Sequence, residues 1–464
     1  MAGEWKDVEI SAKLVTNIDE VALRRSSAAV ENAFMNEAGG HSRFPGLTQF
    51  VDLTGVAPTY LAEWNGDLMA VSNSRIYRVD KAGTAEDVTG VPLSGSSRPQ
   101  FDKTPESLLM AAGGPILKFR GVTTELLAGA PESTHVGYID GYVLAIEPYT
   151  GTFRFSELDD EEIWNDLDVF AANGKPDNLT GMLITPFREI LMTGDDSVEQ
   201  YQPLPSGANP FYRRYATGEG VPYPYTLLAE DQGVWAVNNR KELARMSGQS
   251  SRPASDDIGL TLEGVDDWTG AWTTSMSLMG QKFVLLQVPV ATNPYGTKGL
   301  TFLYDYRQKK WYTLYGWSNG VPQRWPGWSY VNLWNRHFVG GNGKVLELVN
   351  TAHTNDGEIQ RMLGRTAHID AWGHVGVDNV RARVKRGTAA QGAAAPLFGL
   401  RCLKDNKRWT KWNWKSLGTS GDTQNIIEFG PIGDGYTFQF EWMITDNCPV
   451  ELVRLQAQVS PAEA

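Results

Sequence analysis

Residues 65–79 read Asn-Gly-Asp-Leu-Met-Ala-Val-Ser-Asn-Ser-Arg-Ile-Tyr-Arg-Val, and this stretch shows the pattern that decides the fold. A short apolar strand is followed by a polar turn at 72–74 and by a second strand that ends on Val79. The same unit recurs loosely, about every 35–55 residues, from near Leu61 to Asn350. A repeated strand–turn–strand unit of this period is typical of a β-propeller.

Six more copies follow the first one. They cover residues 107–119, 142–156, 189–201, 233–246, 282–305 and 336–348. The sixth copy departs from the regular pattern, because a loop at 288–300 that is rich in Asn, Pro, Gly and Lys separates its strands. The seventh copy turns at Asn342-Gly343, which is a strong hairpin signal. About seven units within roughly 290 residues predict a six- to seven-bladed β-propeller over residues 51–350.

The composition changes after Asn350. Residues 351–364 are polar and are predicted to form a linker. Segments of strand character then alternate with turns, at 380–384, 397–403, 424–429, 437–444 and 450–459. Regular short strands of this kind predict a small C-terminal β-sandwich-like domain over residues 365–464. Residues 1–50 are predicted to be an N-terminal segment that leads into the propeller through a hairpin turn at Pro45-Gly46. The expected fold class is all-β.

The chain is acidic. It has 54 Asp and Glu against 42 Lys and Arg, a formal net charge of −12. This balance argues against a general nucleic-acid-binding protein, whose affinity comes from neutralising phosphates. It is compatible with a protein past which DNA merely moves, because an acidic wall repels phosphate and lets a duplex slide.

Cysteine usage and hydropathy indicate where the chain folds. Cys402 and Cys448 are too few for a disulfide framework and form no CxxC pair, so two buried free thiols are expected. The N-terminus lacks the basic and apolar regions of a signal peptide. No stretch approaches the ~20 apolar residues of a membrane helix. We therefore expect a soluble protein that is made in the cytoplasm and does not insert into a membrane.

No catalytic or metal-binding constellation stands out. The densest acidic run, Asp159-Asp160-Glu161-Glu162, lacks the glycine and the alternating ligands of a calcium loop, so it is interpreted as a solvated acidic loop. The six histidines form no HExxH motif, and there is no Gly-x-Ser-x-Gly elbow and no phosphate-binding glycine loop. We expect no enzyme activity, no catalytic residue, no metal and no cofactor.

An aromatic stripe lies in the C-terminal domain at Trp409, Trp412 and Trp414. Alternating aromatic residues on a strand can stack on sugars, but more often they form a packed face or a protein interface. A propeller glycosidase would place two carboxylates in its central channel. Acidic residues are too numerous here to select such a pair, and the repeated Ser-x-Asp-x-Gly-x-x-Trp boxes of sialidases are absent.

Nearly the whole chain resembles a known family, strongly over residues 140–250 and diffusely elsewhere. The motifs that carry this resemblance are at 155–160, 164–165, 170–173, 176–182, 188–194, 197–201 and 209–211. Together they resemble the propeller of the tail hub or nozzle proteins of short-tailed bacteriophages, also called packaged-DNA stabilisation proteins. Residues 32–34 and 44–47 look like the start of that family, and the C-terminal β-domain is similar in position and length.

The resemblance implies a structural virion protein of the phage tail. It implies a hexameric ring beneath the portal and adaptor rings, which extends the channel through which DNA leaves and helps to retain packaged DNA. The implied partners are further copies of this chain, the adaptor ring, tail fibre, spike or needle proteins, and genomic DNA that passes without specific binding. Two alternatives stay open: a carbohydrate-binding or carbohydrate-active propeller at the tail tip, and a bacterial propeller used for protein recognition.

For such a ring we predict a net negative lumen. Basic walls would hold DNA through counterion release, whereas acidic walls raise the cost of adhesion, and salt at ~0.15 M screens this repulsion beyond ~8 Å. The candidate lining residues, all expected in loops between blade strands, are Asp159, Asp160, Glu161, Glu162, Asp195 and Asp196. The alternative is that these residues only solubilise the outer surface.

Overall fold

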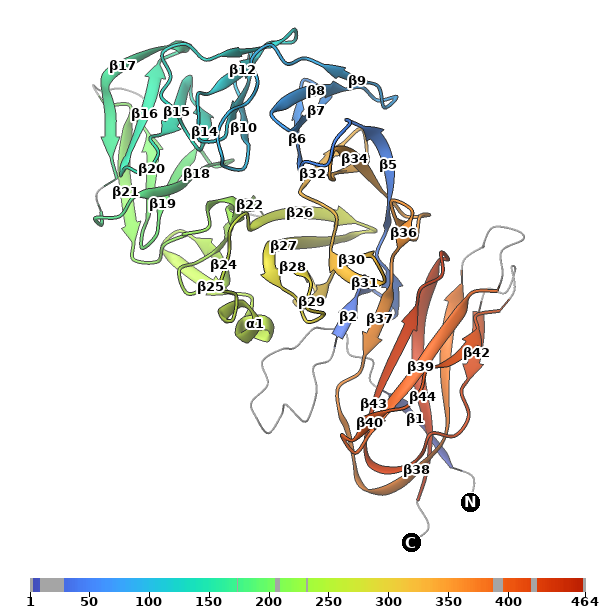
Figure 1. Ribbon diagram of the computed structural model, residues 1–464. Helices are drawn as coiled ribbons and strands as arrows, with labels where there is room; N and C mark the ends of the chain where they lie inside the picture. The colour runs from blue at the N-terminus through green and yellow to red at the C-terminus, as the bar shows by residue number, and fades with distance from the viewer. Residues whose placement is uncertain are drawn as a thin grey trace.

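The computed structural model describes residues 3–8, 29–172, 174–204, 209–230, 233–386, 395–418 and 424–461. Within them the chain is almost entirely β-structure, and helical turns are confined to η2 (Pro224–Thr226), η3 (Asp256–Ile258) and α1 (Gly259–Glu263). No helix among these residues is long and apolar enough to cross a membrane. Figure 1 shows a ring of blades with an elongated β-domain attached at its rim.

The ring is a β-propeller whose described residues form seven four-stranded antiparallel units. The first blade consists of β6 (Thr59–Trp64), β7 (Asp67–Ser72), β8 (Arg75–Val79) and β9 (Ala85–Asp87), and the second of β10 (Gln100–Lys103), β11 (Leu108–Ala111), β12 (Leu117–Phe119) and β13 (Thr124–Leu126). The third blade consists of β14 (Val136–Ile139), β15 (Tyr142–Ile146), β16 (Thr152–Glu157) and β17 (Asp160–Ala171). The fourth consists of β18 (Leu179–Thr185), β19 (Glu189–Gly194), β20 (Val198–Pro203) and β21 (Phe211–Thr217). The other three are β22 (Leu228–Glu230), β23 (Gly233–Val237), β24 (Leu243–Ser247) and β25 (Ser250–Pro253); β26 (Trp272–Leu278), β27 (Gln281–Thr292), β28 (Lys298–Asp305) and β29 (Lys310–Thr313); and β32 (Ser329–Leu333), β33 (Arg336–Gly340), β34 (Lys344–Val349) and β5 (Gly46–Asp52). A short hairpin, β30 (Tyr315–Ser318) with β31 (Val321–Arg324), lies between the last two.

Strand β7 shows why the apolar repeat produces this arrangement. Successive side chains of a strand point to opposite faces of its sheet. Leu68 and Ala70 pack against the last blade, in a cluster with Phe338. Met69 and Val71 pack against the second blade. A strand buried on both faces reads as a continuous apolar run, which is the signal in the sequence.

The ring is closed by a strand from the N-terminal segment. β5 pairs antiparallel with β34, so the last blade combines three strands from its own repeat with one strand from residues 46–52. The same sheet continues into β35 (Thr354–Asn355) and β36 (Glu358–Ile359). The first strands of neighbouring blades contact one another and surround the axis.

The C-terminal domain is built around long strands. They are β37 (Met362–Arg365), β38 (Ile369–Arg386), β39 (Leu397–Lys404), β40 (Arg408–Trp409), β41 (Asn413–Ser416), β42 (Gln424–Glu428), β43 (Gly433–Ile444) and β44 (Val450–Pro461). β39 pairs with β43, and β38 pairs with β42, β43 and β44. The N-terminal strand β1 (Glu4–Val8) adds to β44. Cys402 and Cys448 are buried in this domain, and neither belongs to a disulfide.

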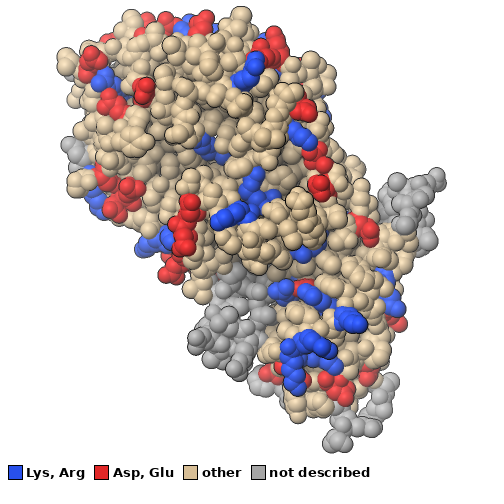
Figure 2. All heavy atoms as spheres, in the orientation of Figure 1, with Lys and Arg blue, Asp and Glu red and all other residues tan. Residues whose placement is uncertain are grey.

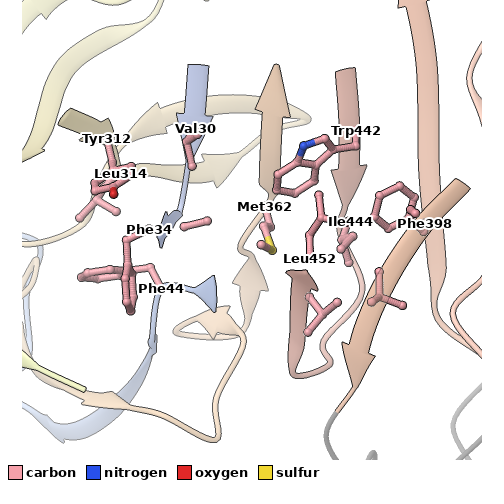
Figure 3. Close-up of a cluster of buried hydrophobic side chains, with 14 of the residues drawn as sticks. Val30, Phe34, Phe44, Tyr312, Leu314, Met362, Phe398, Trp442, Ile444 and Leu452 are labelled. Carbon is pink, nitrogen blue, oxygen red and sulfur yellow. The ribbon is translucent and has the colours of Figure 1, made fainter. Parts of the chain in front are cut away.

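A single buried cluster joins the two bodies. The N-terminal strands β2 (Ala29–Glu31), β3 (Ala33–Met35) and β4 (His41–Arg43) lie between them: β2 pairs with β29 of the propeller and with β37, and β4 pairs with β44. Figure 3 shows side chains of this cluster in a row from the propeller to the C-terminal domain: Tyr312, Leu314, Phe34, Phe44, Val30, Met362, Leu452, Ile444, Trp442 and Phe398. We call β2, β3, β4 and the residues packed on them the junction.

The structure divides the chain differently from the expected boundaries. The boundary at residue 50 falls inside β5, and residues 29–43 pair with both bodies instead of only leading into the propeller. The segment 351–364, predicted as a linker, contains β35, β36 and most of β37. Both differences have one cause. These short strands pair with strands far away in the sequence, so no local pattern shows them.

Candidate functional site

The acidic run lies on the outer edge of the third blade. Asp159 occupies the turn between β16 and β17 with a φ of 56°. Asp160, Glu161 and Glu162 belong to β17, the outermost strand of that blade, and not to a loop as predicted. A groove of about 460 Å³ runs beside them and also contains Arg120.

Two of these carboxylates are paired across the interface with the second blade. Arg120 Nη2 contacts Glu161 Oε1 at 2.7 Å, and Lys118 forms an ion pair with Glu162. Thr104 Oγ1 donates to Glu161 Oε2 at 2.9 Å. The hydrogen bond from Lys118 lowers the pKa of Glu162 below its ordinary value. Glu161 and Glu162 therefore add little net negative charge to this surface.

Asp195 and Asp196 form the turn between β19 and β20 in the fourth blade. Burial, together with the negative charges of Asp177 and Asp196, raises the pKa of Asp195. Asp196 Oδ1 accepts a hydrogen bond from Asn239 Nδ2 at 3.1 Å, so this turn contacts the fifth blade.

The two acidic clusters lie on opposite faces of the propeller. Asp159 N donates to Gly141 O, and Asp140 pairs with Arg188 in the turn between β18 and β19. The acidic run therefore shares a face with that turn. Asp195 lies at the other end of β19, and six residues of strand span roughly 20 Å. A channel wall formed by one face would include only one of the clusters.

The three tryptophans gather on the outer surface of the C-terminal domain. The guanidinium of Arg401 lies 4.7 Å from the Trp409 ring and 4.5 Å from the Trp412 ring. The rings of Trp412 and Trp414 are 5.7 Å apart. Trp414 covers Gly399, where an added Cβ would approach its ring to 2.7 Å. We call these residues the tryptophan face.

A buried carboxylate and two arginines hold the tryptophan face in place. Glu441 is fully buried, and it accepts hydrogen bonds from Arg365 Nε at 2.6 Å and from Arg401 Nε at 2.7 Å. One carboxylate thus holds two guanidinium groups, which leaves the trio with a positive charge. Because Arg401 stacks on Trp409 and Trp412, part of their surface is already covered, while Trp414 stays 38% exposed. Figure 2 shows basic side chains gathered on this side of the C-terminal domain.

Three polar residues of the junction were not predicted as functional. Asn32 Nδ2 donates to the carbonyls of Tyr315 and Arg361 at 3.0 and 2.8 Å. Glu31 pairs with Arg361. Arg43 Nη1 donates to the carbonyl of Asp446 at 2.6 Å. The one signal in the sequence was that these residues lie in or next to segments 32–34 and 44–47, which resemble the start of the family. Their partners lie hundreds of residues away.

Nothing in the described residues forms a metal site, since no group of three or more His, Cys, Asp or Glu side chains comes together there.

Comparison with known proteins places the propeller in a family. Residues 24–353 match the family model described as bacteriophage P22 Gp10, beta-propeller. The chain belongs to this family of structural phage proteins. The match spans β2 to β5 and all seven blades, and it ends just before the C-terminal domain. The resemblance expected from the sequence is confirmed at the level of the family and of the propeller fold.

Solved structures add little to this. The chain is similar to the WD40 domain of Pan2 from Neurospora crassa, at 10% identity and a TM-score of 0.42, over 66% of this chain and 96% of that one. It is also similar to virginiamycin B lyase from Staphylococcus aureus, at 8% identity and a TM-score of 0.41, over 65% and 98%. Similarity at this level carries no argument about function. No curated protein matches the chain.

Proposed function

We propose that this chain is the tail hub or nozzle subunit of a short-tailed bacteriophage. In this proposal six copies form a ring below the portal and adaptor rings, and the ring extends the channel through which DNA leaves the head. It retains the packaged genome and lets it pass during ejection. The observation that carries the proposal is the match of residues 24–353 to the P22 Gp10 propeller family.

The junction supports a role as a rigid ring subunit. A ring that withstands the pressure of packaged DNA needs subunits whose domains do not move apart. Phe34 packs on Phe283 of the propeller with ring centroids 5.2 Å apart, and β2 pairs with strands of both bodies. The continuous core makes the propeller and the C-terminal domain one unit.

The tryptophan face is the proposed contact between neighbouring subunits. Heterologous contacts between unlike surfaces close into rings when the rotation permits. Residues 401–415 contain six Lys and Arg and a single Asp, in a chain whose net charge is −12. An acidic surface of the next subunit therefore complements this face, and Trp414 supplies an aromatic anchor of the kind enriched in interfaces. The adaptor ring and the fibre, spike or needle proteins would bind elsewhere on the ring.

In this proposal DNA passes the ring without specific binding. Lys118 and Arg120 neutralise Glu162 and Glu161. If the channel ran along the face of the propeller that carries this acidic run, its repulsion of DNA would therefore come from Asp159 and Asp160. A lumen on the other face would rest on Asp195 and Asp196. The protein would be made in the host cytoplasm and act in the virion tail without enzyme activity. Release of reducing sugar from host polysaccharide by the purified protein would contradict the last point.

The proposal is tested on purified virions. Immunogold labelling and mass spectrometry of isolated tails should find the chain there, at about six copies per portal ring. Its absence from tails would refute the proposal. The ring contact is tested with the double variant W412A/W414A, which should stop ring incorporation. Tyr149→Ala is the matched control, because Tyr149 is an aromatic residue that is 90% exposed in the propeller.

A further inference from the structure

The axis of the propeller contains a cavity that the proposed function does not use. It has a volume of about 190 Å³ and is lined by the first strands of several blades. Among its lining residues, all in the described part of the chain, none is Asp or Glu, and Arg98 is the single Lys or Arg. Figure 2 shows basic side chains in the hollow at the centre of the propeller.

Arg98 enters this cavity with most of its hydrogen-bonding capacity unused. Its guanidinium lies 4.8 Å from the rings of both Tyr60 and Trp272. Nη2 donates to the carbonyl of Trp328 at 2.6 Å. A guanidinium has five N–H donors, and within the described residues this is the one protein acceptor that the Arg98 side chain has. No described carboxylate pairs with it.

A second arginine adds to the positive potential. Arg324 Nη1 donates to Gln287 Oε1 and to Gly327 O, both at 2.8 Å, and its guanidinium lies 3.7 Å from the Trp328 ring. Burial, with the charge of Arg98 adding to it, lowers the pKa of Arg324 to about 10. Burial also lowers the pKa of Arg98 to about 10. Both groups are therefore cationic at neutral pH, and neither forms an ion pair with a carboxylate in the described part of the chain.

The remaining wall is fixed and uncharged. Trp272 Nε1 donates to Gln287 Oε1 at 2.9 Å, which holds the ring that Arg98 faces. The His135 ring stacks on Tyr225 with centroids 5.4 Å apart. Burial lowers the pKa of His135 to about 4, so it carries no charge at neutral pH. The lining also includes Tyr60, Tyr225 and Gln100, whose side chains carry neutral hydrogen-bonding groups.

We propose that this cavity binds a small oxyanion, a phosphate or a carboxylate group, on the free edge of the Arg98 guanidinium. Arg98 is partly withdrawn from bulk water and has no counter-charge among the described residues, and an oxyanion would supply that charge. The planar fork of arginine matches the two oxygens of either group. This proposal does not depend on the proposed hexameric ring, because the cavity lies within the propeller of a single chain.

The test is isothermal titration of the full chain with sodium phosphate and, separately, with sodium acetate. Sodium chloride at equal ionic strength is the blank. We expect saturable uptake of one oxyanion per chain, and the tighter of the two titrants identifies the group that the cavity selects. Absence of saturable uptake of both titrants would overturn the proposal.

Variants locate the site. R98Q should weaken the oxyanion about tenfold or more, because it removes a charge-assisted contact. R98K keeps the charge but lacks the fork, and should fall between R98Q and the native chain. R188Q is the control, since Arg188 pairs with Asp140 on the rim. Unchanged affinity in R98Q would overturn the proposal, and if R98Q does not fold, unchanged affinity in R98K has the same meaning.

Discussion

The blades and the junction are both buried β-structure, but they are assembled differently. Apart from the closure between the last blade and the first, each blade interface is formed by neighbours in the sequence: Met69 of the first blade and Met110 of the second, for example, share one buried cluster. The junction is formed by residues such as Phe34, Phe283 and Trp442, which are far apart in the chain. Sequence repeats therefore build the propeller, whereas one core that does not repeat joins the propeller and the C-terminal domain into one body.

The largest expected effect is at the centre of the junction. Phe34→Ala should lower the free energy of unfolding by about 3–5 kcal/mol, because it removes a buried aromatic ring and leaves a cavity. Hydrogen exchange should also accelerate in both β29 and β43. Phe119→Ala, in the interface of the first two blades, should cost a similar free energy without affecting β43. Unchanged exchange in β43 of the Phe34 variant would show that the domains are not coupled through this core.

A smaller loss is expected from the polar part of the junction. Asn32→Ala removes three hydrogen bonds, including the one from Tyr315 N at 2.9 Å, and takes the side-chain donor away from the buried carbonyl of Tyr315 and the part-buried carbonyl of Arg361. We expect a loss of about 1–3 kcal/mol in urea denaturation. Asn32→Gly should lose less, because glycine accepts the φ of 51° at this position. A loss below about 0.5 kcal/mol for the alanine variant would contradict a clamping role.

The smallest expected effect is between blades. Glu162→Gln should cost less than about 1 kcal/mol at pH 7, because its pair with Lys118 is partly exposed. Folding lowers the pKa of Glu162 below 4.5. The ion pair of Glu162 therefore adds to the free energy of unfolding above pH 4.5, and this contribution is lost as the pH falls through the lowered pKa. The difference between native and variant chains should therefore vanish in acid. Glu125→Gln, 4.0 Å from the same lysine, is the control. A difference that persists in acid would assign another role to Glu162.

The same contrast explains what the sequence could predict. The seven apolar repeats are the two middle strands of the seven blades, as residues 65–79 are β7 and β8. Outer strands such as β9 and β13 were missed, because they are short and largely exposed. The closing role of β5 depends on β34, about 300 residues later, and no local pattern encodes such a partner.

The candidate sites follow the same rule. The tryptophans and the acidic run were visible as local patterns. Their partners, Arg365 and Glu441 for the tryptophan face and Lys118 and Arg120 for the acidic run, come from other strands or another blade. Arg98 could not be picked out from the sequence. It becomes a candidate only because several blades together form a cavity whose described lining contains no carboxylate.

The decisive measurement for the proposed hub ring is a cryo-electron microscopy reconstruction of the intact tail. We expect six copies of this chain in a closed ring below the adaptor. We also expect the tryptophan face of each C-terminal domain to contact an acidic surface of the next copy. A tail ring at this position built from another protein would refute the proposed function, and a ring of this chain that leaves Trp412 and Trp414 in solvent would refute the proposed contact.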